Sequence, residues 1–84
     1  MLDNTIVNCN KPLLREVIGK NIKSFRKKHK ITQEKLAELS GIHRTSITKY
    51  ETAKATPTLE HLLLIAKVLN ESPNSILYAW EIAF

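Results

Sequence analysis

Two short helical patterns meet at a glycine within residues 32–52, and this stretch constrains the fold more than any other part of the chain. Thr32 can cap the first helix through its hydroxyl, and Glu34 suits the positive end of the helix dipole. Gly41 can end that helix, because glycine adopts the left-handed conformation without a steric cost. A second helical pattern covers residues 43–51. Helices joined by so tight a turn cross steeply, so the stretch predicts a helix-turn-helix.

The second helix of this pair has Ile47 and Tyr50 on its inward side and an entirely polar outward face. A helix that stands out from its domain fits the major groove of B-DNA, where such side chains can read base edges or hold phosphates. Polar outer faces on short helices are also commonly just solvated, so the stretch alone leaves both interpretations open. The outward side chains are Arg44, Thr45, Thr48 and Lys49.

The overall charge favours a polyanionic partner. The formal net charge is +5, which points to nucleic acid before an acidic membrane. A membrane partner finds little support, because no apolar run approaches the ~20 residues that span a bilayer. A chain of 84 residues makes one domain and leaves no room for a separate sensor or catalytic domain, so we expect no small-molecule ligand.

Cysteine and histidine usage argues against a metal site. Cys9 is the single cysteine, so an intrachain disulfide is excluded and a reducing cytoplasm is the expected location, while an intermolecular disulfide stays open as an alternative. The three histidines, His29, His43 and His61, lack the short spacings of a preformed metal site. Ser46 with these histidines offers no nucleophile, base and orienting group at a recognisable spacing. We therefore expect no metal, no cofactor and no enzyme.

The N-terminal part predicts an arm at residues 1–10 and a domain over residues 11–84. Asn10 can cap a first helix that tolerates Pro12 in its opening turn and runs to about His29. Eight of the thirteen Lys and Arg residues lie in or beside this helix, and they repel one another unless something negative neutralises them. We expect phosphate contacts from the C-terminal part of the run, at Lys23, Lys27 and Lys28.

The C-terminal part predicts two more helices. Residues 52–57 are small and polar and end in proline, which indicates a loop. Thr58 can cap the fourth helix, and a Ser-Pro pair at 72–73 can start a fifth. The segment 73–84 is mostly apolar toward its end, and exposed apolar patches commonly mark a partner surface. We expect a homodimer joined through this C-terminal helix, with an interface that includes Ile65, Val68, Trp80, Ile82 and Phe84.

A larger set of residues shares the spacing of a known family, and these are Ile18, Ile22, Arg26, Thr32, Gln33, Leu36, Ala37, Gly41, Ser46, Ile47, Tyr50, Glu51, Lys54, Pro57, Leu59, Leu62, Ala66 and Leu69. Over roughly residues 18–77 the chain therefore resembles the phage repressor and Cro type (XRE-like) of helix-turn-helix transcriptional regulators. The resemblance implies an all-α, five-helix bundle with a central helix-turn-helix, the lambda repressor-like DNA-binding domain. It also implies that double-stranded DNA is the partner.

The resemblance assigns roles within the site. It implies that Gln33 lies beside a phosphate and that Arg26 pairs with Glu51. The alternative for Arg26 is one more solvated cation. We expect further phosphate contacts from Ser46 and Lys54. The positions that face the groove in this family are held here by His43, Arg44, Thr45, Thr48 and Lys49.

Two departures from the family pattern concern turns. Lys30 and Ala53 stand where family members often have glycine, so we expect both turns to be shaped differently. The family also varies freely on the recognition face, so the operator sequence does not carry over.

The leading interpretation is a sequence-specific regulator that acts as a homodimer on a near-palindromic operator. The size and the apolar C-terminus of the chain look most like those of a restriction-modification controller or a small phage-type repressor. A second interpretation is a protein-interaction module, such as an antitoxin or adapter, that uses the apolar C-terminal helix, because function does not follow from fold. The polar groove face with Arg44 and Lys49 argues against this alternative.

Overall fold

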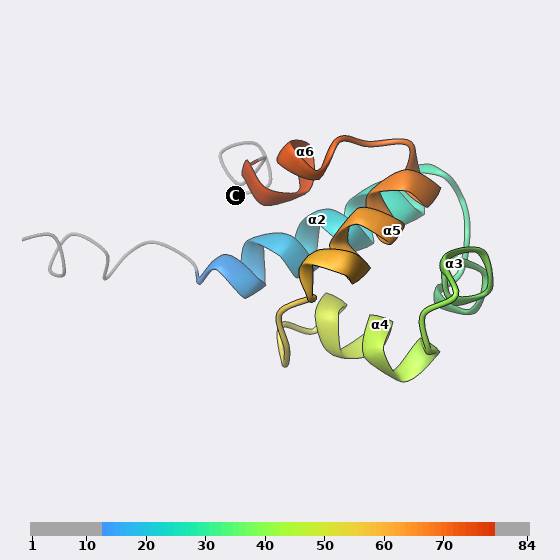
Figure 1. The fold of residues 1–84 in the computed structure, drawn as a ribbon, viewed down its shortest axis with the longest axis horizontal. Helices are drawn as coiled ribbons and strands as arrows, with labels where there is room; N and C mark the ends of the chain where they lie inside the picture. The colour runs from blue at the N-terminus through green and yellow to red at the C-terminus, as the bar shows by residue number, and fades with distance from the viewer. Residues whose placement is uncertain (1–12, 79–84) are drawn as a thin grey trace, which may run out of the picture.

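The computed structural model describes residues 13–78, and in this range the chain folds into a bundle of five α-helices (Figure 1). The predicted all-α, five-helix fold is confirmed. Helix α2 runs through the bundle and contacts α4 on one side and α6 on the other. The helices are α2 (Leu14–Lys28), α3 (Gln33–Ser40), α4 (Arg44–Glu51), α5 (Leu59–Leu69) and α6 (Pro73–Tyr78). The predicted arm at residues 1–10 lies outside the described residues.

Short polar side chains start three of the helices, as the sequence predicts. Thr32, Thr58 and Ser72 precede α3, α5 and α6, respectively. Each hydroxyl accepts a hydrogen bond from the backbone N–H three residues further on, at 3.0, 3.1 and 3.1 Å. Each cap therefore satisfies one of the N–H groups that the first helical turn leaves without a partner.

Helix α2 begins later than the predicted cap at Asn10. Leu13 has an extended backbone, with φ −69° and ψ 150°, so the helix starts at Leu14. The N–H of Leu13 donates to Oε1 of Glu16 at 3.1 Å, which supplies the start with a side-chain acceptor. Pro12 favours a later start as well, because a proline biases the residue before it away from helix.

The turns after α2 and α4 contain residues with positive φ that are not glycine. Lys30 has φ 60° and Ala53 has φ 63°. Both positions thus have the left-handed conformation that glycine adopts most easily, and a side chain there costs free energy. Lys30 and Ala53 therefore introduce strain into these turns, because each adopts a conformation that favours glycine.

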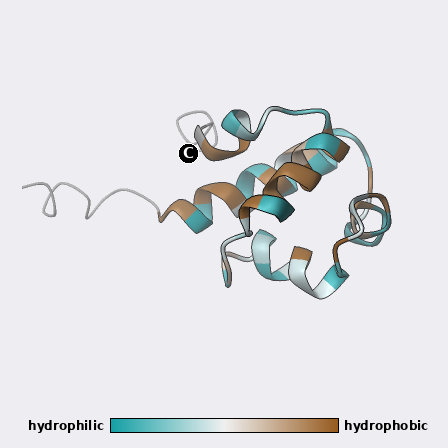
Figure 2. Cartoon of the chain, viewed as in Figure 1, coloured by the Kyte–Doolittle hydropathy of each residue, from teal (hydrophilic) through white to brown (hydrophobic). Residues whose placement is uncertain are grey.

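The core lies between α2, α5 and the inner sides of the shorter helices. Figure 2 shows α2 and α5 with alternating brown and teal segments, as expected for amphipathic helices, whereas most of α4 is pale or teal. Helix α4 lies at the edge of the bundle, on the side opposite α6 (Figure 1). The side chains with essentially no exposure are those of Ile22, Leu36, Ile47, Ile65, Leu69 and Ile76.

Candidate DNA-binding surface

The turn between α3 and α4 fixes how α4 stands on the bundle. Gly41 has φ 77°, and its N–H donates to the Ala37 carbonyl at 2.9 Å. Ile42 is 3% exposed, and its N–H donates to the Ser40 hydroxyl at 3.2 Å. The left-handed glycine turns the chain, and the buried isoleucine anchors it directly before α4. The predicted helix-turn-helix is present.

A polar network ties α4 to α2 and α3. The Arg26 guanidinium donates from Nε to Glu51 Oε2 at 2.6 Å and from Nη2 to Glu51 Oε1 at 3.0 Å. Its Nη1 donates to the Ile31 carbonyl at 2.8 Å. Gln33 Nε2 donates to Glu51 Oε1 at 2.9 Å, and Gln33 Oε1 accepts from the Thr48 hydroxyl at 2.8 Å. Five directional bonds thus fix the orientation of three helices.

The Arg26–Glu51 pair at the centre of this network is buried. The side chains are 10% and 1% exposed, respectively. The hydrogen bond to Glu51 raises the pKa of Arg26 above its ordinary value, against the opposing effect of burial. Such a bidentate, charge-assisted contact combines strength with a defined geometry. The ion pair that the family resemblance implies is therefore present, and it holds α2 against α4.

The outward face of α4 keeps most of the predicted base-reading residues exposed. His43, Arg44, Thr45 and Lys49 are exposed, whereas Thr48 is half-buried and donates to Gln33. His43 is the N-cap residue of α4, and its Nδ1 accepts from the Thr45 N–H at 3.1 Å. The helix accordingly starts at Arg44, one residue later than the sequence pattern indicates. The exposed members form one polar edge at the start and outer side of α4.

Arg44 is held from the neighbouring helix. Its Nη1 lies 2.9 Å from Oε2 of Glu34, and the two side chains are 56% and 65% exposed. The pKa of Glu34 is lowered chiefly by the N–H of its own backbone at the start of α3, and additionally by Arg44. An ionised carboxylate therefore stands beside the arginine at the first turn of α4.

The predicted phosphate-contacting residues are not all brought together. Lys23 and Lys27 lie one turn apart on α2, and the helical period places them on the flank next to Arg26, which faces α4. Lys28 follows Arg26 by two residues, about 200° around the helix, so it lies on the side away from α4. Lys54 is exposed in the loop after α4. Ser46 is half-buried on α4, and the Gln33 amide is already bonded within the network.

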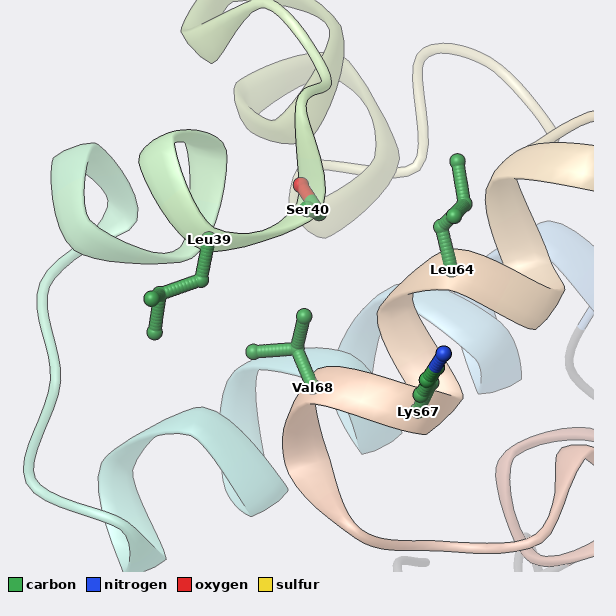
Figure 3. Close-up of a pocket in the computed structure, with 5 residues that line it drawn as sticks. All are labelled: Leu39, Ser40, Leu64, Lys67 and Val68. Carbon is green, nitrogen blue, oxygen red and sulfur yellow. The ribbon is translucent and has the colours of Figure 1, made fainter.

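The expected dimer interface is only partly described. Ile65 has 0% exposure and belongs to the core of the monomer, so its proposed place in an interface is wrong. Val68 is half-buried beside a cleft of about 410 Å³, where Leu39 and Val68 point toward one another (Figure 3). Leu64 lines the same cleft and is 36% exposed. Trp80, Ile82 and Phe84 lie outside the described residues.

Comparison with known proteins identifies the group to which this fold and site belong. Residues 22–76 match the helix-turn-helix family. The chain belongs to this family.

Relatives of this helix-turn-helix protein include controllers and phage repressors. Control protein C.SmaI of Serratia marcescens is 39% identical over 76% of this chain and 76% of its own length. Repressor protein C2 of Salmonella phage P22 is 34% identical over 74% of this chain, but the match covers only 29% of the curated repressor. The protein is thus a DNA-binding transcriptional regulator of the Cro/C1 type.

Solved structures show the same architecture. The P22 c2 repressor in complex with a synthetic operator has a TM-score of 0.69 at 34% identity, and the match covers 73% of this chain and 92% of that chain. The restriction-modification controller protein C.AhdI from Aeromonas hydrophila has a TM-score of 0.71 at 26% identity, covering 74% and 94% of the two chains. The expected lambda repressor-like domain is therefore confirmed for the regulator.

Two residues that shape the regulator's site have contacts that the sequence does not predict. The sequence indicates Glu34 as a residue that stabilises a helix start, and this role does not predict its ion pair with Arg44. Opposite charges in the first turns of two crossing helices would predict such a pair. Gly19 lies inside α2, where a β-carbon would come within 2.3 Å of the Tyr50 carbonyl oxygen. A glycine in a helix interior destabilises the helix, so its presence there indicates that a neighbouring segment packs too closely for a side chain.

Within residues 13–78, no three His, Cys, Asp or Glu side chains are grouped so that they could hold a metal ion. None of the helices between residues 13 and 78 has the length and the apolar character of a membrane span. Cys9 lies outside the described residues.

Proposed function

We propose that this regulator acts in the cytoplasm as a homodimer that binds a near-palindromic operator through the outward face of α4. The observation that carries the proposal is the exposed polar edge of α4, which the buried Arg26–Glu51 pair and its partners hold out from the bundle. A helix presented in this way can enter the major groove. The operator complex of the P22 c2 repressor, which shares the fold, supports the same choice of partner.

The exposed side chains suggest a division of labour on the DNA. Arg44 lies at the first position of α4, and an arginine can make two hydrogen bonds to guanine. Lys23 and Lys27 stand on another helix, on the flank next to α4, where they suit phosphate contacts. Lys49 and Lys54 extend this basic edge at the end of α4 and in the following loop. We expect the weakest contribution from Lys28, because it lies on the far side of α2.

The dimer interface that we propose consists of the exposed side of α5 and the C-terminal segment. Leu64 and Val68 form a partly exposed apolar cleft with Leu39 (Figure 3), and Trp80, Ile82 and Phe84 would extend the interface. A symmetric dimer would place two α4 helices about 34 to 36 Å apart, one turn of DNA. Occupancy of the operator would then depend on protein concentration, as in a controller or small phage-type repressor.

The DNA-binding part of the proposal can be tested with two matched variants. Selection from a random duplex library provides an operator, and a scrambled duplex serves as the reference. Arg44→Ala should weaken operator binding by roughly 1 to 3 kcal/mol and relax the preference at one base pair. Lys27→Ala should weaken both duplexes alike and lower the salt slope by about one unit. Equal losses on both duplexes for Arg44→Ala would make Arg44 a phosphate contact. Failure to select any operator would contradict the proposed function.

Sedimentation at micromolar concentration tests the dimer. The wild type should sediment as a dimer, and Leu64→Glu and Trp80→Glu should shift it toward the monomer, because each buries a charge in the interface. Leu14→Glu is the control, since Leu14 is 56% exposed at the start of α2 and lies outside the proposed interface. A monomeric wild type at this concentration would refute the interface. An equal effect of Leu14→Glu would show that the interface is not where we propose it.

A further inference from the structure

The ion pair between Glu34 and Arg44 places a carboxylate on the surface proposed to bind a polyanion. Oε2 of Glu34 lies 2.9 Å from Nη1 of Arg44, across the turn that joins α3 to α4. Both side chains are more than half exposed, so neither is needed to fill the core. A carboxylate at this position repels phosphates, and only a specific benefit would offset that repulsion.

The donors of the guanidinium indicate what the benefit is. An arginine carries five N–H groups, and the bond to Glu34 is made from Nη1. The remaining donors can still form two hydrogen bonds to O6 and N7 of a guanine, so Arg44 can read this base while Glu34 holds it. A phosphate lies at the rim of the groove and not on its floor, so contact with a phosphate would require Arg44 to turn away from Glu34. The ion pair would then break, and the Glu34 carboxylate would face the DNA backbone.

We propose that Glu34 is a specificity-determining residue, an inference that rests on the proposed DNA-binding function. Glu34 lowers the affinity for every duplex through its charge, and it lowers the affinity for a non-cognate duplex most, because there Arg44 has to leave it. The discrimination thus comes partly from a penalty on wrong sequences, which is a general route to specificity. Glu34 is ionised at neutral pH, since its pKa is lowered by its backbone N–H and by Arg44.

Glu38 provides a matched control for the charge of Glu34. It lies on the same helix and is also exposed, but it pairs with Lys35 at 3.5 Å instead of with a residue of α4. Glu34→Gln and Glu38→Gln remove the same charge from α3, so both should raise the affinity for DNA in general. Only Glu34→Gln should also lower the ratio of operator affinity to scrambled-duplex affinity, by up to about fivefold, as expected for an exposed ion pair.

The decisive experiment measures both affinities for the wild type, Glu34→Gln, Glu38→Gln, Arg44→Ala and the Glu34→Gln/Arg44→Ala double variant. In the Arg44→Ala background, Glu34→Gln should leave the ratio unchanged, because the group that Glu34 restrains is absent. Glu34→Ala should reproduce the loss of discrimination, and circular dichroism checks that each variant is folded. A ratio for Glu34→Gln equal to or above that of the wild type would overturn the inference. A wild type that does not discriminate would overturn the proposed function instead.

Discussion

Replacing Glu51 tests whether the buried polar network holds the helix-turn-helix in place. Glu51 is 1% exposed at its side chain and accepts two hydrogen bonds from Arg26 and one from Gln33. Glu51→Leu removes all three and leaves the charge of Arg26 buried with the Ile31 carbonyl as a hydrogen-bond partner. Removing one partner of a buried pair costs about 3 to 5 kcal/mol. Against a typical unfolding free energy of roughly 5 to 15 kcal/mol, this is a large loss.

The double variant Arg26→Met/Glu51→Leu separates the pair's own contribution from the cost of an orphaned charge. It should recover most of the loss, because apolar side chains of similar volume often replace a buried ion pair without a net cost. Urea unfolding followed by circular dichroism gives the free energies. Glu38→Leu serves as an exposed control and should change stability by less than about 0.5 kcal/mol. A cost below about 1 kcal/mol for Glu51→Leu, or additive effects in the double variant, would refute this account of the network.

Two further predictions concern backbone positions, and thermal unfolding measures both. Gly19→Ala should destabilise the protein by about 1 to 3 kcal/mol although alanine has the better helix propensity, because the added β-carbon would lie 2.3 Å from the Tyr50 carbonyl oxygen. Ser24→Ala on the exposed side of α2 is the control. A rise in Tm for Gly19→Ala would contradict the close packing. Ala53→Gly should stabilise by up to about 1 kcal/mol, since relief of the left-handed strain outweighs the added chain entropy. Ala55→Gly should not stabilise, and a lower Tm for Ala53→Gly would refute the strain.

Local chemistry explains why much of the fold could be predicted from the sequence. The hydroxyls of Thr32 and Thr58 cap helices as expected, and Gly41 adopts the left-handed conformation that ends α3. These features depend on neighbouring atoms in the chain, so short patterns predict them well. The start of α2 could not be placed correctly, because the carboxylate of Glu16 offers an acceptor that competes with the cap at Asn10.

Contacts between helices were harder to predict, because spacing along the chain does not say which faces meet. Ile65 and Val68 looked alike in the sequence, yet Ile65 is fully buried and Val68 lies at the edge of a cleft. The family resemblance, and not helical periodicity, indicates Glu51 as the partner of Arg26, since Glu51 lies 25 residues further on. The ion pair between Arg44 and Glu34 depends on the angle at which α3 and α4 cross. The sequence pattern indicates that the two helices cross, but it does not give this angle.

The pairing of the first and last described helices has a consequence for how the regulator is degraded. The buried side-chain amide of Asn21 donates to the Ile76 carbonyl at 2.7 Å, and the side chain of Ile76 has 0% exposure. After a protease cuts between α5 and α6, only noncovalent contacts hold this acceptor and this core side chain, and α2 loses its packing on the face opposite α4 once α6 dissociates. We therefore expect nicked molecules to be cleared as whole domains, without a persistent fragment that could occupy the operator and block the intact regulator.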